Sequence, residues 1–187
     1  MSICIFSGTF NPIHKAHLEV AKYALKKYNF EKIIFIPAYL PPHKEIDKNL
    51  AQHRFEMVKL AIKNEPKFEI SDIEFQNEGK SYSLITVQKI IEKYKLKEKL
   101  NFIIGTDAFE KIESWYKVEE LKKLVHFIVF PRGIEIDKEY FLSKGFDFEL
   151  TDKKFLDISS TNIRKQKQNG NLEIVEGYIK KNGLYKN

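Results

Sequence analysis

The stretch Ser7-Gly-Thr-Phe-Asn-Pro-Ile-His-Lys-Ala-His-Leu18 decides the fold, because it joins two segments of different periodicity. Residues 3–6 before it are continuously apolar, which is typical of a strand buried on both faces. After it, apolar side chains recur at helical spacing over residues 15–28. The stretch is therefore predicted to be a glycine-containing turn between a buried strand and a helix.

The residues of this turn favour phosphate binding. The first turn of a helix offers unpaired backbone N–H groups and the positive end of the helix dipole. Gly8 and Thr9 let the backbone approach an anion closely, and His14 and His17 share one helix face. Their neutral or charged imidazoles can contact the same anion, so we expect nucleotide chemistry. A zinc site at this pair is disfavoured, because no third ligand stands at a typical spacing.

Strand-like and helix-like segments alternate along the rest of the chain. Further strands are predicted at 33–36, 101–104 and 127–130, and helices at 51–64, 83–94, 160–168 and 172–181. This rhythm predicts an α/β fold with a doubly wound parallel sheet and C-terminal helices, in a single domain over 1–187. Ligands of such folds bind at the carboxyl ends of the strands, so the loops 38–44, 105–107 and 132–133 are expected to converge there.

Composition narrows the function classes. Only three of the 32 basic residues are arginines (Arg54, Arg132 and Arg164), and the lysines are scattered among 26 acids. Such scatter is typical of a solvated surface, so the net charge of +6 does not predict a nucleic-acid partner. No apolar run has the length of a membrane span, and a cytoplasmic protein without a membrane partner is expected. The single cysteine, Cys4, is expected to be a buried core thiol. The sequence leaves open whether the chain forms a homo-oligomer.

A second phosphate motif lies near the end of the chain, at Ser159-Ser-Thr-Asn-Ile-Arg164. Ser159 or Ser160 can cap a helix, and Arg164 then lies on the side of Ser160 and Thr161. A helix start beside a guanidinium is suited to clamp a polyphosphate. The alternative is an ordinary capped helix with a surface arginine.

Several single residues have two readings. Lys44, in the loop Pro41-Pro-His-Lys44, can contact phosphate or be solvated, and Asp107 after Gly105 can bind ribose hydroxyls or cap a helix. Trp115 can be a core residue or stack on an aromatic ligand. Gly79-Lys-Ser81 imitates the end of a P-loop, but Glu74 occupies the position of its first glycine, and no G-x-G-x-x-G is present.

The two phosphate motifs, 8–17 and 158–164, together resemble the nucleotidyltransferase superfamily. With Pro41-Pro-His-Lys44, 81–83, 102–107, Trp115-Tyr116 and 178–185, the chain resembles the bacterial nicotinate-nucleotide adenylyltransferases. The resemblance implies a Rossmann-like fold and the transfer of AMP from ATP to nicotinate mononucleotide, giving deamido-NAD and pyrophosphate. It also implies Mg²⁺ that is bound with ATP, with no dedicated metal site. The chain departs from the common pattern at Ser7, Asn11 and Ala16.

The resemblance further implies roles for individual residues. The catalytic residues would hold the ATP phosphates: His14, His17 and Arg164. Further ATP contacts would come from both motifs and the loop after the fourth strand: Gly8, Thr9, Phe10, Gly105, Asp107, Ser160 and Thr161. The mononucleotide would be bound by Lys44, Thr86, Trp115 and Tyr116, with Trp115 stacked on the pyridine ring.

Other functions remain as alternatives. Phosphopantetheine adenylyltransferases and cytidylyltransferases share the phosphate motifs, but Trp115-Tyr116 and the Pro41-Pro-His-Lys44 loop argue against both. A class I aminoacyl-tRNA synthetase fragment would leave little room for a tRNA-reading domain. A basic RNA-binding module would leave the two phosphate motifs unexplained.

Overall fold

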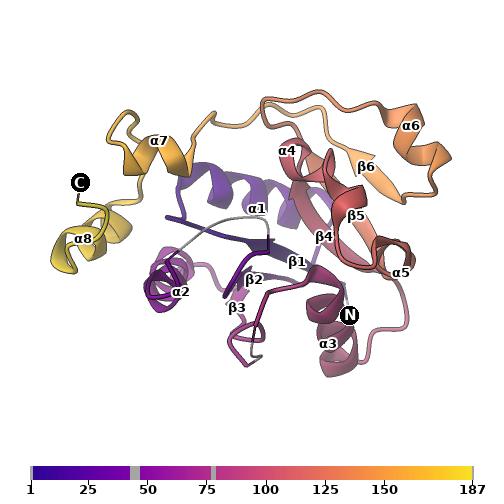
Figure 1. The fold of residues 1–187 in the computed structure, drawn as a ribbon, viewed down its shortest axis with the longest axis horizontal. Helices are drawn as coiled ribbons and strands as arrows, with labels where there is room; N and C mark the ends of the chain where they lie inside the picture. Colours follow the sequence, from indigo (N-terminus) through magenta and orange to yellow (C-terminus); the bar gives the residue numbers. More distant parts are fainter. Residues whose placement is uncertain (1, 43–46, 77–78, 187) are drawn as a thin grey trace.

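The computed structural model describes residues 2–42, 47–76 and 79–186. Over these residues, six parallel strands form one sheet in the order β3-β2-β1-β4-β5-β6 (Figure 1). The strands are β1 (Ile3–Gly8), β2 (Lys32–Pro37), β3 (Phe68–Ile70), β4 (Leu100–Gly105), β5 (Val125–Phe130) and β6 (Phe148–Leu150). The predicted doubly wound parallel sheet is confirmed.

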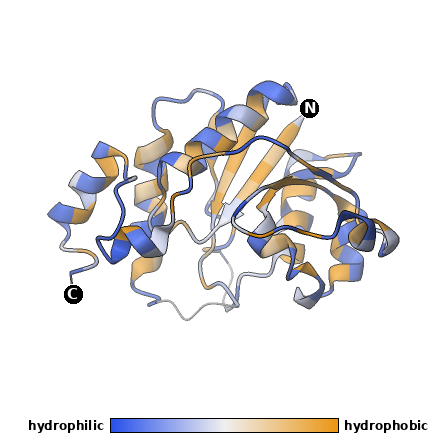
Figure 2. Ribbon diagram, turned by 90° about the horizontal axis from the view of Figure 1, so that it is seen from above, coloured by the Kyte–Doolittle hydropathy of each residue, from blue (hydrophilic) through white to orange (hydrophobic). Residues whose placement is uncertain are grey.

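Both faces of the sheet are buried, which explains the continuous apolar runs. Along β1, Ile3 and Ile5 enter one hydrophobic core, while Cys4 and Phe6 enter the other. The central strands are accordingly hydrophobic along their length, whereas the helices around them carry both hydrophobic and hydrophilic residues (Figure 2). Cys4 is fully buried as a free thiol, as its position in the strand predicts.

Helices cover the two faces. Leu18 of α1 and Val58 of α2 belong to the core around Phe6, and Val87 of α3 and Leu121 of α5 belong to the core around Ile5. The bounds of the helices are α1 (Lys15–Lys27), α2 (Leu50–Ile62), α3 (Ser83–Tyr94), α4 (Thr106–Phe109), η1 (Ile112–Ser114), α5 (Val118–Leu124), α6 (Lys138–Ser143), α7 (Ser160–Arg164) and α8 (Glu173–Lys181). No helix in the described ranges is long and apolar enough to cross a membrane.

The strand order reverses between β1 and β4, which are hydrogen-bonded neighbours at the middle of the sheet. The central strands end level with one another, because Gly8 pairs with Pro37 and Gly105 pairs with Phe130. A crevice for a ligand is expected outside such a reversal, at the carboxyl ends of the strands. The loops after β1 and β4 therefore meet where a ligand can bind.

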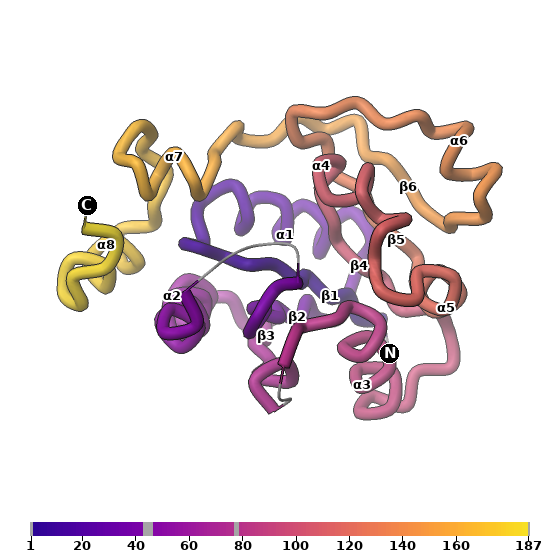
Figure 3. Tube along the Cα trace, viewed as in Figure 1, coloured from indigo at the N-terminus to yellow at the C-terminus, as the bar shows by residue number. Residues whose placement is uncertain are grey.

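The last part of the chain returns to this crevice. After β6, the backbone runs back across the molecule to α7 and α8, which lie on the far side from α6 (Figures 1 and 3). Helix α8 packs against α2, where His53 Nδ1 and the Tyr178 hydroxyl are 2.9 Å apart. This return brings the second phosphate motif next to the first.

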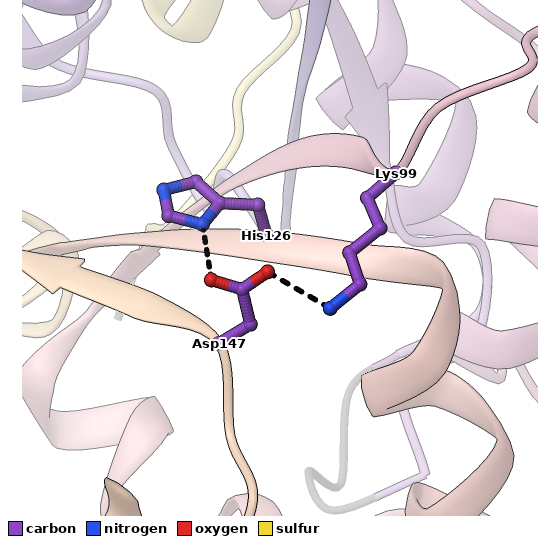
Figure 4. Close-up of polar contacts among 3 residues, drawn as sticks. All are labelled: Lys99, His126 and Asp147. Atoms are coloured by element: carbon purple, nitrogen blue, oxygen red, sulfur yellow. Dashed lines mark hydrogen bonds and ion pairs between the residues drawn. The ribbon is translucent and has the colours of Figure 1, made fainter.

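The amino ends of the strands carry a separate polar cluster at β4, β5 and β6. The Asp147 carboxylate accepts a hydrogen bond from Lys99 Nζ at 2.8 Å and lies 2.8 Å from His126 Nδ1 (Figure 4). Lys99 precedes β4, and Asp147 precedes β6. The cluster therefore connects β4, β5 and the edge strand β6 at the end of the sheet opposite the crevice.

The structure adds elements that were not predicted and shortens one that was. The helices α5 and α6 were not predicted. The edge strands β3 and β6 were not predicted, because each has only three residues and no distinct apolar run. The helix predicted over 160–168 is shorter, ending at Arg164, because Lys165 caps it and Gln166 takes a left-handed φ of 55°.

Candidate functional site

A cavity of about 1290 Å³ lies at the carboxyl ends of β1 and β4. Most of the predicted site residues line it, although they come from four separate parts of the chain. They are Gly8, Thr9, Phe10, His14, His17, Gly105, Asp107, Trp115, Tyr116, Ser160, Thr161 and Arg164. Lys44 lies outside the described residues, and Thr86 does not line the cavity.

The two histidines form a stacked pair at the start of α1. Their ring centroids are 3.7 Å apart and the ring planes are inclined by 30°. His14 precedes the helix with extended backbone, and its N–H donates to His17 Nδ1 at 3.2 Å. This bond makes Nδ1 of His17 the acceptor, so in the neutral ring the proton lies on Nε2, the nitrogen farther along the side chain.

His14 is buried in a way that calls for a partner. His14 is only 2% exposed, and neither nitrogen of its ring has a hydrogen-bond partner among the described residues. Burial, followed by the positive charge of Arg132, lowers its pKa from 6.5 to about 3. The imidazole is therefore neutral at pH 7 and has one N–H to donate. Because buried polar groups are rarely left unpaired, this orphan group supports an anionic ligand in the cavity.

Phe10 and Gly8 hold the histidine pair in place. The Phe10 ring packs edge-on against His17 with centroids 5.1 Å apart, and its backbone takes a left-handed φ of 47°. A Cβ added to Gly8 would lie 3.1 Å from the Phe10 ring. The predicted Phe10 is only 3% exposed, so its side chain supports the turn more than it offers a surface to a ligand.

The second phosphate motif contacts the first directly. Ser160 Oγ donates to the Pro12 carbonyl at 2.9 Å, and Arg164 Nη1 donates to the Asn11 carbonyl at 2.5 Å. Arg164 Nη2 also donates to Thr161 Oγ1 at 3.3 Å, as the i, i+3 spacing predicts. The Ser159 hydroxyl accepts from the Asn162 N–H and so caps α7. The two motifs therefore form one wall of the cavity.

Arg54 supports the same turn from behind. It is fully buried, and its guanidinium donates to the carbonyls of Thr9, Ala38 and Tyr39 at 2.8, 2.6 and 2.9 Å. Burial is the main influence on its pKa and lowers it. One side chain thus ties the loop after β1 to the loop after β2.

The loop after β4 places a carboxylate in the cavity. Asp107 Oδ1 is buried without a hydrogen-bond partner in the described structure, and Oδ2 lies 3.5 Å from Arg132 Nη1. A Cβ on Gly105 would lie 2.6 Å from Asp107 Oδ1, so a larger residue there would displace this carboxylate. The Arg132 N–H donates to Thr106 Oγ1 at 2.8 Å, which joins this loop to the one after β5.

Aromatic side chains line the opposite part of the cavity. Trp115 packs against Phe102 with centroids 6.2 Å apart, and Tyr116 stacks on Tyr82 at 4.5 Å. Tyr116 is 44% exposed, which is unusual for a large aromatic ring and leaves a face for a planar ligand. Trp115 packs against the core and also lines the cavity, so its stacking on an aromatic ligand stays a prediction.

Thr86 lies in a different position from the one predicted. It is 3% exposed, and its hydroxyl donates to Glu74 Oε1 at 2.7 Å. Glu74 lines the cavity in its place, and burial raises the pKa of this carboxyl group. A helix beginning at Ser83 turns position 86 inward, which the motif alone does not reveal.

Many further residues line the cavity without having been assigned a role from the sequence, among them Asn11, Glu74, Arg132 and Tyr185. Arg132 had a usable signal, because arginine is rare in this chain and position 132 follows a predicted strand. No cluster of three or more His, Cys, Asp or Glu side chains among the described residues could hold a metal ion.

Comparison with known proteins places these features in a family context. The sequence profile of the cytidylyltransferase-like family matches residues 5–166. A protein of Caldicellulosiruptor saccharolyticus named "Probable nicotinate-nucleotide adenylyltransferase" is 39% identical, with all of both chains covered. A protein of the same name from Clostridium botulinum strain Kyoto is also 39% identical, over 97% of this chain and 98% of its own length.

Solved structures agree on the fold. Plasmodium falciparum nicotinic acid mononucleotide adenylyltransferase complexed with NaAD superposes with a TM-score of 0.82 at 24% identity. The match covers 98% of this chain and 96% of the other. At this level of identity, the superposition supports the architecture of the sheet and its helices.

Proposed function

Because the chain belongs to the cytidylyltransferase-like family, and within it to the nicotinate-nucleotide adenylyltransferases, we propose that it transfers AMP from ATP to nicotinate mononucleotide. The products are deamido-NAD and pyrophosphate. One observation carries the proposal within the site: the two phosphate motifs and Trp115 line the same cavity, on different parts of its wall. This arrangement suits a triphosphate beside an aromatic ring.

The triphosphate is held by the wall formed from the two motifs. His14 and His17 donate ring N–H groups, and the start of α7 offers the backbone N–H groups of Ser160 and Thr161. Arg164 adds a fixed positive charge, and Ser160 and Thr161 lie beside it. A bound phosphate favours the charged imidazole, so it raises the pKa of His14 from its low value in the free protein.

The adenosine of ATP and the pyridine riboside of nicotinate mononucleotide occupy the rest of the cavity. Asp107, beside Gly105, accepts hydrogen bonds from the adenosine ribose through its partly exposed carboxylate. Trp115 stacks on the pyridine ring, with Tyr116 beside it. Thr86 hydrogen-bonds to Glu74, which lines the cavity at this end, and contacts of Thr86 and Lys44 with the mononucleotide stay predictions.

The reaction needs no covalent enzyme intermediate. The mononucleotide phosphate is itself a nucleophile, so its oxygen attacks the α-phosphorus of ATP in line while pyrophosphate leaves. The protein contributes alignment and charge neutralisation, and alignment alone can supply roughly 7–11 kcal/mol. When bound, Mg²⁺ neutralises phosphate charge and is held by phosphate oxygens and water, because the described residues offer no carboxylate cluster.

The test is pyrophosphate release from ATP with a panel of acceptors. We expect release with nicotinate mononucleotide, and formation of deamido-NAD in equal amount. Release with phosphopantetheine or with CTP and a phosphorylated alcohol, and none with nicotinate mononucleotide, would assign the chain to another branch of the family. A His17→Ala variant, measured in parallel, controls for contaminating pyrophosphatase or ATPase activity.

A further inference from the structure

The C-terminal tail of the chain makes a specific contact with the phosphate-binding turn. The Tyr185 hydroxyl donates to Asn11 Oδ1 at 2.5 Å, across 174 positions of sequence. Both residues line the cavity, and Asn11 is only 9% exposed. Asn11 is also the residue whose carbonyl accepts from Arg164. The turn is therefore held by its side chain from one direction and by its backbone from another.

The local sequence directs Tyr185 to this place. Helix α8 ends at Lys181 and is followed by Gly183 at a left-handed φ of 63°, and the Leu184 N–H donates to the Ile179 carbonyl at 3.1 Å. The Gly183 N–H donates to the Lys180 carbonyl, which completes the reversal common at helix ends. Tyr185 itself takes a left-handed φ of 58°, which is uncommon for a bulky residue and is tolerated only where other contacts hold it.

Electrostatics keep the Tyr185 hydroxyl in the donor state. Burial raises its pKa to about 12, although Arg164 and Arg54 act in the opposite direction. The hydroxyl therefore keeps its proton over the whole range in which the protein works. A neutral donor at this point fixes the carboxamide of Asn11, since only the oxygen corner of that group can accept the bond.

We propose that Tyr185 is a positioning residue for the triphosphate, which holds the Asn11 carboxamide so that its Nδ2 donors serve the cavity. The proposal rests on the proposed function, because it assigns a triphosphate to this wall. A carboxamide whose oxygen is held by Tyr185 keeps its two N–H donors for a ligand, in a residue that lines the cavity and whose carbonyl accepts from Arg164. Without the Tyr185 hydroxyl, the group is free to rotate and offer its oxygen, which repels phosphate.

The first experiment compares Tyr185→Phe with a matched control, Tyr178→Phe. Each change removes one hydroxyl hydrogen bond of the C-terminal region, but the Tyr178 hydroxyl contacts His53, away from the turn. We expect Tyr185→Phe to raise the Kd of Mg·ATP, measured by calorimetry without acceptor, about three- to tenfold. The KM for ATP should rise in parallel, with the KM for nicotinate mononucleotide unchanged. Tyr178→Phe should leave all three constants as in the unaltered protein.

The second experiment asks whether Tyr185 acts through Asn11. In a double-mutant cycle, Asn11→Ala should weaken ATP binding, and adding Tyr185→Phe should weaken it no further. Unaltered ATP binding in Tyr185→Phe, equal losses in both Phe variants, or multiplied losses in the cycle would each overturn the inference. Asn11→Ala also probes the contact if Tyr185→Phe does not fold.

The two proposals can fail separately. ATP that binds without AMP transfer to nicotinate mononucleotide would count against the proposed function, while the calorimetric comparison would still decide the role of Tyr185. Transfer that proceeds normally in Tyr185→Phe, with unchanged ATP affinity, would count against the role of Tyr185 alone.

Discussion

His14 and His17 stack with ring centroids 3.7 Å apart, and the backbone N–H of His14 donates to the ring of His17. Burial and the positive charge of Arg132 keep His14 neutral at pH 7, so the two rings are not charged together in the free protein. A bound polyphosphate favours the charged form of His14. The charge of His14 therefore responds to the ligand, and the first two predictions below concern this pair.

Replacing His17 by alanine should lower turnover by about two to three orders of magnitude, with the fold intact. The reason is that losing one well-placed donor to transition-state charge costs about 2.7–4 kcal/mol. Steady-state pyrophosphate release checks this, with circular dichroism as the control for folding. His126→Ala is the matched variant, because His126 lies at the amino end of β5, and its turnover should be unchanged. A His17→Ala enzyme within threefold of normal would remove His17 from the mechanism.

His14 should make the protein less stable as the pH falls from 7 toward 4. Its pKa is about 3 in the folded protein and 6.5 in the unfolded chain, so the unfolded chain binds more protons between these values. Stability from this group is complete above pH 6.5 and is lost progressively below it. Urea unfolding at several pH values measures the effect. His14→Gln should show a shallower loss than the unaltered protein, and parallel curves would contradict the assignment.

Gly105→Ala should weaken ATP binding at least tenfold, because the new Cβ would lie 2.6 Å from Asp107 Oδ1 and push the carboxylate aside. Gly177→Ala is the matched control. A Cβ at Gly177 meets nothing within 4 Å, and alanine within α8 should raise stability by about 0.5–1 kcal/mol. Calorimetric titration with Mg·ATP and thermal unfolding of both variants provide the test. Equal ATP affinity in the two variants would show that Asp107 does not need this geometry.

Arg54→Met should cost about 3–5 kcal/mol of stability, because it leaves the carbonyls of Thr9, Ala38 and Tyr39 buried without their donor. Arg132→Met is the comparison, since the Arg132 side chain is 48% exposed and its loss should change stability by less than about 1 kcal/mol. Denaturant unfolding of both variants measures the difference. Similar stabilities would mean that the two loops are held by other contacts.

Asp147→Asn should reduce stability at neutral pH without affecting ATP binding. Burial would raise the pKa of Asp147, but the hydrogen bonds from Lys99 and His126 outweigh it and lower the pKa below 3.8. The stabilisation is therefore present above pH 3.8 and is lost as the pH falls through the lower, folded-state value. Unfolding at pH 7 should separate the variant from the unaltered protein, and unfolding in strong acid should not. An altered KM for ATP would contradict the placement of this cluster away from the cavity.

The sheet could be predicted from sequence because a strand that is buried on both faces has a continuous run of apolar residues. Residues 3–6 and 127–130 are such runs, and each became a central strand. The strands β3 and β6 left no such trace, since each is three residues long and only one residue of each is fully buried. The positions of β3 and β6 are set by their pairing with β2 and β5, and the periodicity of apolar residues in the sequence does not reveal that pairing.

Sequence could predict which residues meet at the cavity where they belong to short local motifs. His14, His17, Ser160 and Arg164 belong to short motifs whose geometry follows from helix starts, and all four line the cavity. Thr86 and Tyr185 show the limit of such reasoning. The inward rotation of Thr86 depends on where α3 begins, and the contact of Tyr185 depends on the reversal after α8.

The hydrogen bond from Ser160 to the Pro12 carbonyl joins residues 148 positions apart, and this separation has a consequence for the synthesis of the chain on the ribosome. A ribosome that adds about 5–20 residues per second makes Ser160 roughly 7 to 30 s after Pro12. The strands β2 to β5 are made in that interval and can pair with β1, so most of the core can assemble before the polyphosphate wall exists. During translation the nascent chain thus passes through a compact stage that cannot yet consume ATP, and catalytic competence arrives only as the final segment docks.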